Sequence, residues 1–306
     1  MKVDTKEATE IHAAGILDSR LLPNDDFEEL WDSIILDAET KNRILSQGIL
    51  NFTLRSRVPR SVLPLHGIIL LTGAPGTGKT SLARGLASRI ASSFNKSEFL
   101  FIEVEPHSLT SSALGKSQKA VTELLSLTIA EVASTRPVIV LLDEVETLAS
   151  NRSKLSFEAN PVDVHRTTDA VLAQLDHLAA LYPRLLFIAT SNFPEAIDEA
   201  FVSRADLTEE IGKPNADACR AILTDTVTGL AAVFPEIEKI ISEPEYDRAV
   251  QLCEGLDGRK IRKLVASACA FEKETAIDPR RLTAKDILLA VQHERKIAGL
   301  AKGAAK

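Results

Sequence analysis

The 306-residue sequence is poor in cysteine and aromatic residues, with three Cys, one Trp and two Tyr, and it has no long apolar run. The cysteines at 219, 253 and 269 are far apart and form no C-x-x-C pair, so neither a zinc site nor a disulfide framework is expected. No apolar segment approaches the roughly eighteen residues that cross a bilayer. The polar first residues do not resemble a secretory signal, so the sequence predicts a cytoplasmic protein without membrane contact.

A strongly basic balance is also absent. The formal net charge is −7 and 45% of the residues are hydrophobic. An acidic chain argues against a surface that coats nucleic acid, and the apolar fraction is ordinary for a globular protein. The length allows one large domain or two modest ones.

The strongest signal present is a glycine-rich loop that follows the apolar run 67–72. It consists of Gly73, Ala74, Pro75, Gly76, Thr77, Gly78, Lys79 and Thr80, with Ser81 next in the chain. Such a loop curls backbone N–H groups around an anion, Lys79 supplies charge for the outer phosphates, and Thr80 offers a hydroxyl to Mg²⁺. A helix that begins near Lys79 adds its positive dipole end. The pattern predicts binding of a nucleoside triphosphate.

Short apolar runs alternate with helical patterns around this loop. Strands are expected at 67–72, 99–104, 138–142, 185–190 and 207–211, and helices at 27–36, 38–54, 79–93, 117–134 and 161–181. Alternating strands and helices predict an α/β domain with a five-stranded parallel sheet covered on both faces. From 216 to 300 only helical periodicity is present, which predicts a small all-α domain.

A pair of acids, Asp143 and Glu144, ends the buried strand expected at 138–142. Ligands bind at the carboxyl ends of strands in open α/β sheets. Asp143 can hold the Mg²⁺ that Thr80 touches, and Glu144 can orient and polarise an attacking water. A strand that simply ends in solvated acids is the alternative, and the phosphate loop upstream argues against it.

Three further residues carry weaker signals. Asn192 follows another buried run and could lie near the γ-phosphate, although Ser-Asn also simply ends strands. Arg204 could reach a neighbour's phosphate, but the residues alone favour a surface arginine paired with Asp206 or Asp198. Arg259, at the start of a helix in the α domain, could contact phosphate or be ordinary surface charge.

In this order and spacing, the pieces resemble an AAA+ ATPase. They resemble one branch closely, the pachytene-checkpoint or thyroid-receptor-interactor type, which remodels HORMA-domain proteins. The segments that carry the likeness are 27–33, 73–81, 139–147, 170–176, 190–192, 200–206 and 255–264. The string Ala-Phe-Val-Ser-Arg-Ala-Asp at 200–206 is the narrowest mark, because most AAA+ relatives carry a two-arginine pattern there.

The resemblance implies a role for each weak signal. Asn192 is similar to the family's sensor of the γ-phosphate, Arg204 to its trans-acting arginine finger, and Arg259 to the second sensor in the lid. With Glu144 these residues form the expected catalytic set. The implied assembly is a homo-hexamer that binds ATP and Mg²⁺ at subunit interfaces. It would pull a substrate segment through the ring and convert a HORMA domain from its closed to its open form.

The same resemblance sets the expected domain boundaries. They are an N-terminal extension at 1–21, an AAA+ large domain at 22–214, a helical lid at 215–300 and a flexible tail at 301–306. The first pore loop would fall at 107–115, with Ala113 and Leu114 where the family usually has an aromatic residue. The second would fall near 150–160, where Phe157 could compensate.

A member without a separate N-terminal domain resembles the bacterial versions, which are encoded beside HORMA proteins and cGAS-like nucleotidyltransferases in CBASS antiphage systems. The expected role there is to disassemble the active complex and hold signalling down. Two alternatives remain. One is a nucleotide-controlled DNA-binding module of the initiator or clamp-loader kind, which the charge argues against. The other is an assembly protein that uses ATP only structurally, which the intact Glu144 disfavours.

Overall fold

The computed structural model describes residues 11, 13–94, 97–109, 116–151 and 161–299. Its contacts divide the chain into two compact units. The first contains residues up to Gly73 and Lys79–Ile211, and the second contains Ala74–Gly78 together with the chain from Gly212 onwards. The sequence predicted a boundary at 214/215 and placed the whole glycine-rich loop in the large domain. The structure differs because Gly76 packs on the residues that open a helix of the second unit.

The first unit is built on one six-stranded sheet with the order β1-β3-β4-β5-β2-β6. The strands are β1 (Ile16–Leu22), β2 (Ile68–Thr72), β3 (Phe99–Val104), β4 (Val138–Leu142), β5 (Leu185–Ser191) and β6 (Leu207–Glu210). The strands from β2 to β6 pair in parallel with one another, as the alternating pattern predicted. The sequence signal of β2 to β5 was strong because strands buried on both faces read as continuous apolar runs.

The sixth strand corrects the sequence prediction. The expected N-terminal extension at 1–21 and the purely parallel five-stranded sheet are both wrong, because β1 joins the sheet antiparallel to β3, from Ile16 opposite Val104 to Leu22 opposite Phe99. Only Ser19 and Leu22 of this strand are buried. An edge strand with so few buried positions has neither a continuous apolar run nor a clean alternation, so its sequence does not reveal it.

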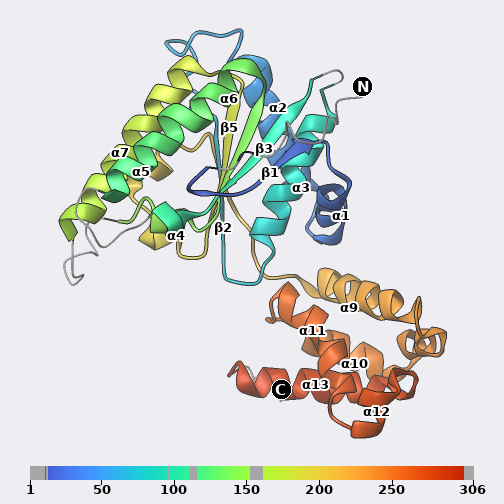
Figure 1. Ribbon diagram of the computed structural model, residues 1–306. Helices are drawn as coiled ribbons and strands as arrows, with labels where there is room; N and C mark the ends of the chain where they lie inside the picture. Colours follow the sequence, from blue (N-terminus) through green and yellow to red (C-terminus); the bar gives the residue numbers. More distant parts are fainter. Residues whose placement is uncertain (1–10, 12, 95–96, 110–115, 152–160, 300–306) are drawn as a thin grey trace, which may run out of the picture. The chain divides into compact units, whose positions relative to one another are not determined.

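Helices cover both faces of the sheet (Figure 1). One apolar cluster joins the sheet to α1 (Asp25–Ser33), α2 (Ala38–Leu54) and α3 (Lys79–Ser92). The other joins it to α5 (Lys116–Glu123), the π-helical stretch η1 (Leu124–Ile129), α6 (Ala130–Thr135) and α7 (Pro161–Leu181). Alternate residues of β2 divide between them, with Leu70 in one cluster and Ile69 in the other, and both are fully buried. Burial of one such side chain contributes roughly 1.5–3 kcal/mol, so the two clusters hold the sheet rigidly.

Short helical segments complete the first unit: α4 (Pro106–Leu109), η2 (Val145–Thr147), η4 (Pro194–Ala196) and α8 (Glu199–Val202). The single helix predicted at 117–134 is instead α5, η1 and α6 in succession, because apolar spacing does not distinguish a π-helical turn from an α-helical one. The side chain of Asn24 caps α1 by accepting the backbone N–H of Phe27.

Asp206 ties the start of β2 to the start of β6. Its carboxylate accepts the backbone N–H groups of His66, Gly67 and Ile68 at 2.9, 2.7 and 3.1 Å. Three charge-assisted hydrogen bonds on one carboxylate make this a strong local link. Asp206 is therefore a structural residue at the amino edge of the sheet, the edge at which the parallel strands begin.

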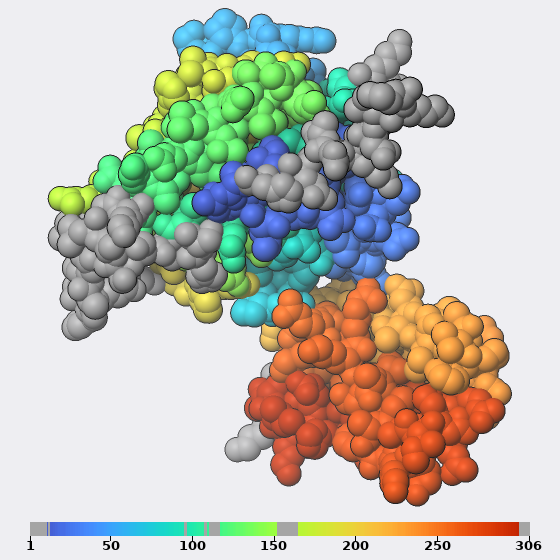
Figure 2. Space-filling model, in the orientation of Figure 1, coloured from blue at the N-terminus to red at the C-terminus, as the bar shows by residue number. Residues whose placement is uncertain are grey.

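Among its described residues, the second unit is entirely helical, as predicted. Its elements are α9 (Ala216–Ala231), η5 (Pro235–Ser242), α10 (Pro244–Leu252), α11 (Gly258–Cys269), α12 (Lys273–Ile277), η6 (Pro279–Arg281) and α13 (Ala284–Ile297). Figure 2 shows these residues, in orange and red, gathered into one body. Thr283 and Asp286 form a capping box at the start of α13, because they exchange backbone-to-side-chain hydrogen bonds of 2.9 and 3.3 Å.

All three cysteines are free thiols, as their spacing predicted. Burial raises the pKa of Cys253 to about 12 and that of Cys219 to about 11, so both stay protonated and unreactive. Among the described helices, none combines the length and hydropathy that a bilayer crossing requires.

Candidate functional site

The predicted site residues of the first unit converge at the carboxyl edge of the sheet, the edge at which the parallel strands end. Strands β4, β5 and β2 are neighbours in that order. Lys79, Asp143 and Asn192 each follow shortly after one of these strands. Since parallel strands end at the same edge, three distant parts of the sequence meet there.

Lys79 opens α3 and its side chain is only 5% exposed. Its ammonium Nζ donates to the carbonyl oxygen of Gly73 at 2.8 Å and to Oδ1 of Asn192 at 2.8 Å. A buried ammonium is costly unless it is hydrogen-bonded, and these two oxygens satisfy part of that need. Both oxygens belong to neutral groups, so the two contacts hold the ammonium at the carboxyl edge without neutralising its charge.

Thr80 and Asp143 form a pair of oxygen ligands. The hydroxyl of Thr80 donates to Oδ1 of Asp143 at 2.9 Å. A hydroxyl beside a carboxylate suits a hard cation such as Mg²⁺, which usually keeps several water or phosphate ligands. Within the described residues no group of three or more His, Cys, Asp or Glu could hold a metal, so a cation here would need further ligands from a nucleotide or water. Ser81 follows on α3 and is half-buried.

Glu144 is exposed, and its backbone is left-handed, with φ of 51° and ψ of 53°. Its Oε1 accepts a hydrogen bond from Nδ2 of Asn192 at 3.0 Å. The amide of Asn192 thus bridges the ammonium of Lys79 and the carboxylate of Glu144. Lysine only donates and an ionised carboxylate only accepts, so this bridge determines which way the amide points.

Two residues that the sequence did not single out complete this edge. The hydroxyl of Thr190 contacts Asp143 and also accepts the backbone N–H of Glu144 at 3.2 Å. The Oε1 of Glu146 accepts the backbone N–H of Asn192 at 3.1 Å, and its Oε2 is buried without a partner in the described part of the chain. Both residues stand next to predicted ones, but sequence spacing alone does not show which strand end a side chain contacts.

The glycines of the loop are required where the backbone is left-handed and crowded. A Cβ on Gly73, which has φ of 143°, would lie 2.2 Å from the carbonyl oxygen of Ile211. One on Gly76, with φ of 85°, would lie 2.4 Å from Oδ1 of Asp257. Only glycine fits such positions without strain. The loop between them is tied to itself by Thr77, whose hydroxyl donates to the carbonyl of Ala74 at 3.0 Å.

Arg259 lies in the second unit, in the first turn of α11. Asp257 caps this helix by accepting the N–H of Lys260 at 2.9 Å, and the backbone N–H of Arg259 donates to the carbonyl of Gly76 at 3.2 Å. The side chain of Arg259 is exposed, and its guanidinium makes no ion pair with any residue that the structure describes. Residues 74–78 of the expected loop and Arg259 thus belong to one compact unit.

Arg204 is not part of the cluster at the carboxyl edge. It precedes β6, and two residues later Asp206 donates its backbone N–H to the carbonyl of Ile68, the first residue of β2. Arg204 therefore lies at the amino edge. The full length of β2 separates it from the loop that follows Thr72, on the order of 15 Å at the rise of a strand.

The guanidinium of Arg204 is held by Asp176 of α7. It donates from Nε at 2.9 Å and from Nη2 at 2.7 Å to the two carboxylate oxygens, and from Nη1 to the carbonyl of Ala200 at 2.6 Å. The hydrogen bond from Arg204 holds the pKa of Asp176 below its ordinary value, and the same contact raises the pKa of Arg204. The ion pair with Asp206 or Asp198 that the sequence suggested is wrong. Asp206 binds backbone N–H groups, and Asp198 caps α8.

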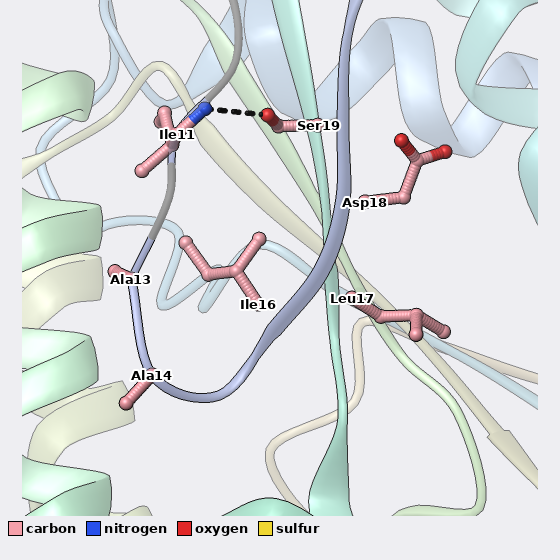
Figure 3. Close-up of a pocket in the computed structure, with 7 residues that line it drawn as sticks. All are labelled: Ile11, Ala13, Ala14, Ile16, Leu17, Asp18 and Ser19. Carbon is pink, nitrogen blue, oxygen red and sulfur yellow. Dashed lines mark hydrogen bonds between the residues drawn. The ribbon is translucent and has the colours of Figure 1, made fainter.

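A separate hollow of about 460 Å³ lies beside β1, and Figure 3 shows its lining. The backbone N–H of Ile11 donates to Oγ of Ser19 across it at 2.8 Å. Among the described residues that line it, Asp18 is the one that carries a charge, and it is paired with Arg20 at 2.6 Å. The described part of the lining therefore offers no cationic group that would hold a phosphate. The expected pore-loop residues Ala113, Leu114 and Phe157 lie outside the described residues.

A mostly parallel α/β sheet whose carboxyl edge carries a buried lysine, a hydroxyl–carboxylate pair and an exposed acid, with a glycine-rich loop directly before that lysine in the sequence, defines a P-loop nucleotide-binding protein. Residues 69–213 match the model of the family described as "ATPase family associated with various cellular activities (AAA)".

Comparison of whole chains narrows this class. CD-NTase-associated protein 6 of Pseudomonas aeruginosa is 56% identical over 92% of this chain and 93% of its own length. A pachytene checkpoint protein 2 homolog of Xenopus tropicalis is 33% identical over 90% of this chain and 69% of its own. In "Structure of E. coli MS115-1 HORMA:CdnC:Trip13 complex", one chain superimposes with a TM-score of 0.71 at 18% identity, covering 91% of this chain and 95% of that one.

The chain belongs to the AAA ATPase family that includes CD-NTase-associated protein 6 and the pachytene checkpoint protein 2 homologues. It is therefore a nucleotide-binding ATPase, as the resemblance in the sequence implied.

Proposed function

We propose that this ATPase uses ATP hydrolysis to remodel a HORMA-domain protein. The observation that carries the hydrolytic part is the contact chain from Lys79 through Asn192 to Glu144, beside the Thr80–Asp143 pair. It brings together a phosphate-binding cation, a cation-binding pair and an exposed carboxylate at one sheet edge. These are the parts that phosphoryl transfer to water needs.

In this proposal the glycine-rich loop, Lys79 and Ser81 bind the phosphates of ATP, and Thr80 with Asp143 hold Mg²⁺. Bound Mg²⁺ would neutralise charge on the phosphate oxygens. Thr80 and Asp143 are already within hydrogen-bond distance of each other, so little rearrangement is needed to present both oxygens to one ion. The fit of the donor set supports Mg²⁺ rather than a softer metal, because no thiolate or imidazole is involved.

Glu144 accepts a proton from the attacking water, and Asn192 orients the reacting groups. The carboxylate of Glu144 is exposed, so water can reach it, and its Oε1 is already aligned by Nδ2 of Asn192. Asn192 also contacts Lys79, so a phosphate that draws Lys79 away would alter the hydrogen bond to Glu144. Through this coupling, Asn192 would respond to the presence of the terminal phosphate and would act as its sensor.

Arg204 acts on the nucleotide of a neighbouring subunit. Its place at the amino edge supports this, because the length of β2 separates it from the chain's own cluster. A guanidinium has five N–H donors, and Asp176 and Ala200 engage three of those on Arg204 in the contacts above. Two donors remain for a phosphate. Hydrolysis would thus require a ring of subunits, and we propose a homo-hexamer with Arg259 as a second sensor of nucleotide.

The proposed substrate is inferred from proteins similar to this chain. The relative from Pseudomonas aeruginosa is named for its association with a CD-NTase, and the fold also occurs in one chain of the HORMA:CdnC:Trip13 complex. We infer that this chain opens a HORMA-domain protein, dismantles its complex with a cGAS-like nucleotidyltransferase and so lowers antiphage signalling in the cytoplasm.

The test combines Glu144→Gln with a HORMA-domain protein as the candidate substrate. Glu144→Gln removes the proton acceptor but keeps the contact to Asn192, so we expect turnover to fall by roughly 10²–10⁴-fold with ATP binding intact. The same variant should retain the HORMA protein in a pull-down with ATP. Glu274→Gln, an exposed position on α12, is the matched control and should behave as wild type. Normal turnover by Glu144→Gln would refute the proposed role of Glu144 in hydrolysis. Failure to capture the HORMA protein in the presence of ATP would refute the proposed substrate.

A further inference from the structure

The backbone of Glu144 adopts a conformation that needs support. Among the described residues, Glu144 is the one non-glycine residue with positive φ. A left-handed backbone is unfavourable for a residue with a Cβ and persists only where the surroundings impose it. Asp143, directly before it, must also hold its carboxylate toward Thr80. The two acids therefore depend on contacts from outside their own strand.

Thr190 supplies those contacts with a single hydroxyl. Its Oγ1 accepts the backbone N–H of Glu144 at 3.2 Å and donates to Oδ1 of Asp143. One hydroxyl has one proton to donate and lone pairs to accept, so both bonds can exist at once. Thr190 is only 1% exposed, so water does not readily replace either bond.

The sheet register brings this hydroxyl to the acid pair. Leu142, the last residue of β4, pairs with Ala189 of β5, so the next positions along the two strands are Asp143 and Thr190. Other buried threonines serve the backbone instead. Thr168 donates to the carbonyl of Leu148 at 3.5 Å, and Thr72 donates to that of Glu209 at 3.4 Å. The two bonds of Thr190 to the acid pair thus set it apart from these.

We propose that Thr190 is a positioning residue for ATP hydrolysis, whose hydroxyl fixes the carboxylate of Asp143 and the left-handed backbone of Glu144 together. The proposal rests on the roles proposed above for these two acids. Without the hydroxyl, the backbone N–H of Glu144 loses its acceptor and Asp143 loses a donor that aligns it. Glu144 would then leave its hydrolytic position although every group that binds nucleotide is still present.

The experiment compares Thr190→Val with Thr190→Ser in the full chain. Valine keeps the shape and removes the hydroxyl, whereas serine keeps the hydroxyl and removes a methyl group. Misplacement of a catalytic group by about 1 Å can cost about 10²-fold in rate, so we expect kcat of Thr190→Val to fall about 10²-fold. KM for ATP should change less than about threefold, and Thr190→Ser should stay within about fivefold of wild-type kcat, because its hydroxyl preserves the geometry.

Two further readouts separate positioning from folding. The Mg²⁺ concentration for half-maximal turnover should rise in Thr190→Val, since Asp143 has lost an aligning bond. Thr168→Val makes the same change at another fully buried threonine and should keep wild-type kcat even if its melting temperature falls. If Thr190→Val does not fold, Thr190→Cys takes its place. A thiol forms only weak hydrogen bonds, so we expect its kcat to lie below that of Thr190→Ser but above zero.

Wild-type kcat in Thr190→Val would overturn the inference. An equal loss in the valine and serine variants would also overturn it, because packing rather than the hydroxyl would then be responsible. These outcomes are distinct from failure of the proposed function. If Glu144→Gln hydrolyses ATP normally, the roles of the acids are wrong, whereas an inactive Glu144→Gln beside a fully active Thr190→Val refutes only the role of Thr190.

Discussion

The two edges of the sheet carry the same kinds of side chain but arrange them differently. At the carboxyl edge, Lys79, Asn192 and Glu144 form a continuous series of contacts, and one backbone there is left-handed. At the amino edge, Arg204 is held by Asp176, and Asp206 binds backbone N–H groups. The carboxyl edge holds groups in positions that favour a ligand, whereas the acids of the amino edge bond to the protein itself.

In the proposed mechanism, this difference explains why one chain would not complete the reaction by itself. Parallel strands gather one set of loops at each edge, and the strand length keeps the two sets apart. Arg204, the cation proposed for a terminal phosphate, is at the edge away from the chain's own Lys79. A second copy can bring its amino edge to the first copy's carboxyl edge, and this is the physical case for catalysis between subunits.

The sharpest test of the comparison is Arg204→Ala. If Arg204 serves a neighbour, turnover should fall roughly 10³-fold or more while ATP binding is kept. A Lys79→Ala variant should lose ATP binding but still carry an intact Arg204. Mixing the two inactive variants should restore part of the phosphate release, because some interfaces would combine Lys79 of one chain with Arg204 of the other. No recovery at any mixing ratio would contradict action between subunits.

Asp206→Ala tests the claim that the amino edge is mainly structural. It leaves three backbone N–H groups without their acceptor, and at about 1 kcal/mol for each lost bond the free energy of unfolding should fall by about 3 kcal/mol. Urea denaturation monitored by circular dichroism measures it. At temperatures where the variant is folded, KM for ATP should stay near the wild-type value. A large rise in KM with unchanged stability would contradict the division between the edges.

Asp176→Asn removes the charge that holds Arg204. The amide of asparagine accepts fewer hydrogen bonds from the guanidinium than a carboxylate does, so Arg204 becomes less ordered. We expect this to cost about 1.4 kcal/mol of transition-state stabilisation, which lowers turnover about tenfold. The hydrogen bond from Arg204 lowers the pKa of Asp176 below 3.8, so its contribution to stability is present above that pH and is lost as pH falls through the lowered pKa. The stability difference between wild type and Asp176→Asn should therefore shrink on acidification below about pH 4. A constant difference down to pH 2 would rule out the ion pair as its source.

The smallest effect is expected from Thr283→Ala in the second unit. It removes the capping box of α13 and should cost about 1 kcal/mol of stability. Phosphate release at 25 °C should be unchanged, because the residue serves only its own helix. Differential scanning calorimetry and an ATPase assay measure the two quantities. Lost activity without a lower melting temperature would give this helix a role that its contacts do not suggest.

Most of the first unit could be predicted because its signals are local. The strands β2 to β5 are short apolar runs, and the glycine-rich loop follows one of them directly. Strand β1 could not be predicted, since only Ser19 and Leu22 are buried in it. The partners Asp176 and Thr190 were also missed. Each contacts a residue at least 28 positions away, and sequence spacing carries no information about such pairs.

By itself, the sequence determined the kind of fold, the order of its elements and the residue types available for nucleotide chemistry, because periodicity and motif spacing are properties of neighbouring residues. The tertiary structure alone decided which groups meet. It placed Asn192 between Lys79 and Glu144, brought Thr190 beside both acids and left Arg204 at the other edge of the sheet. Strand order and register set those distances, and both arise from packing between segments far apart in the chain.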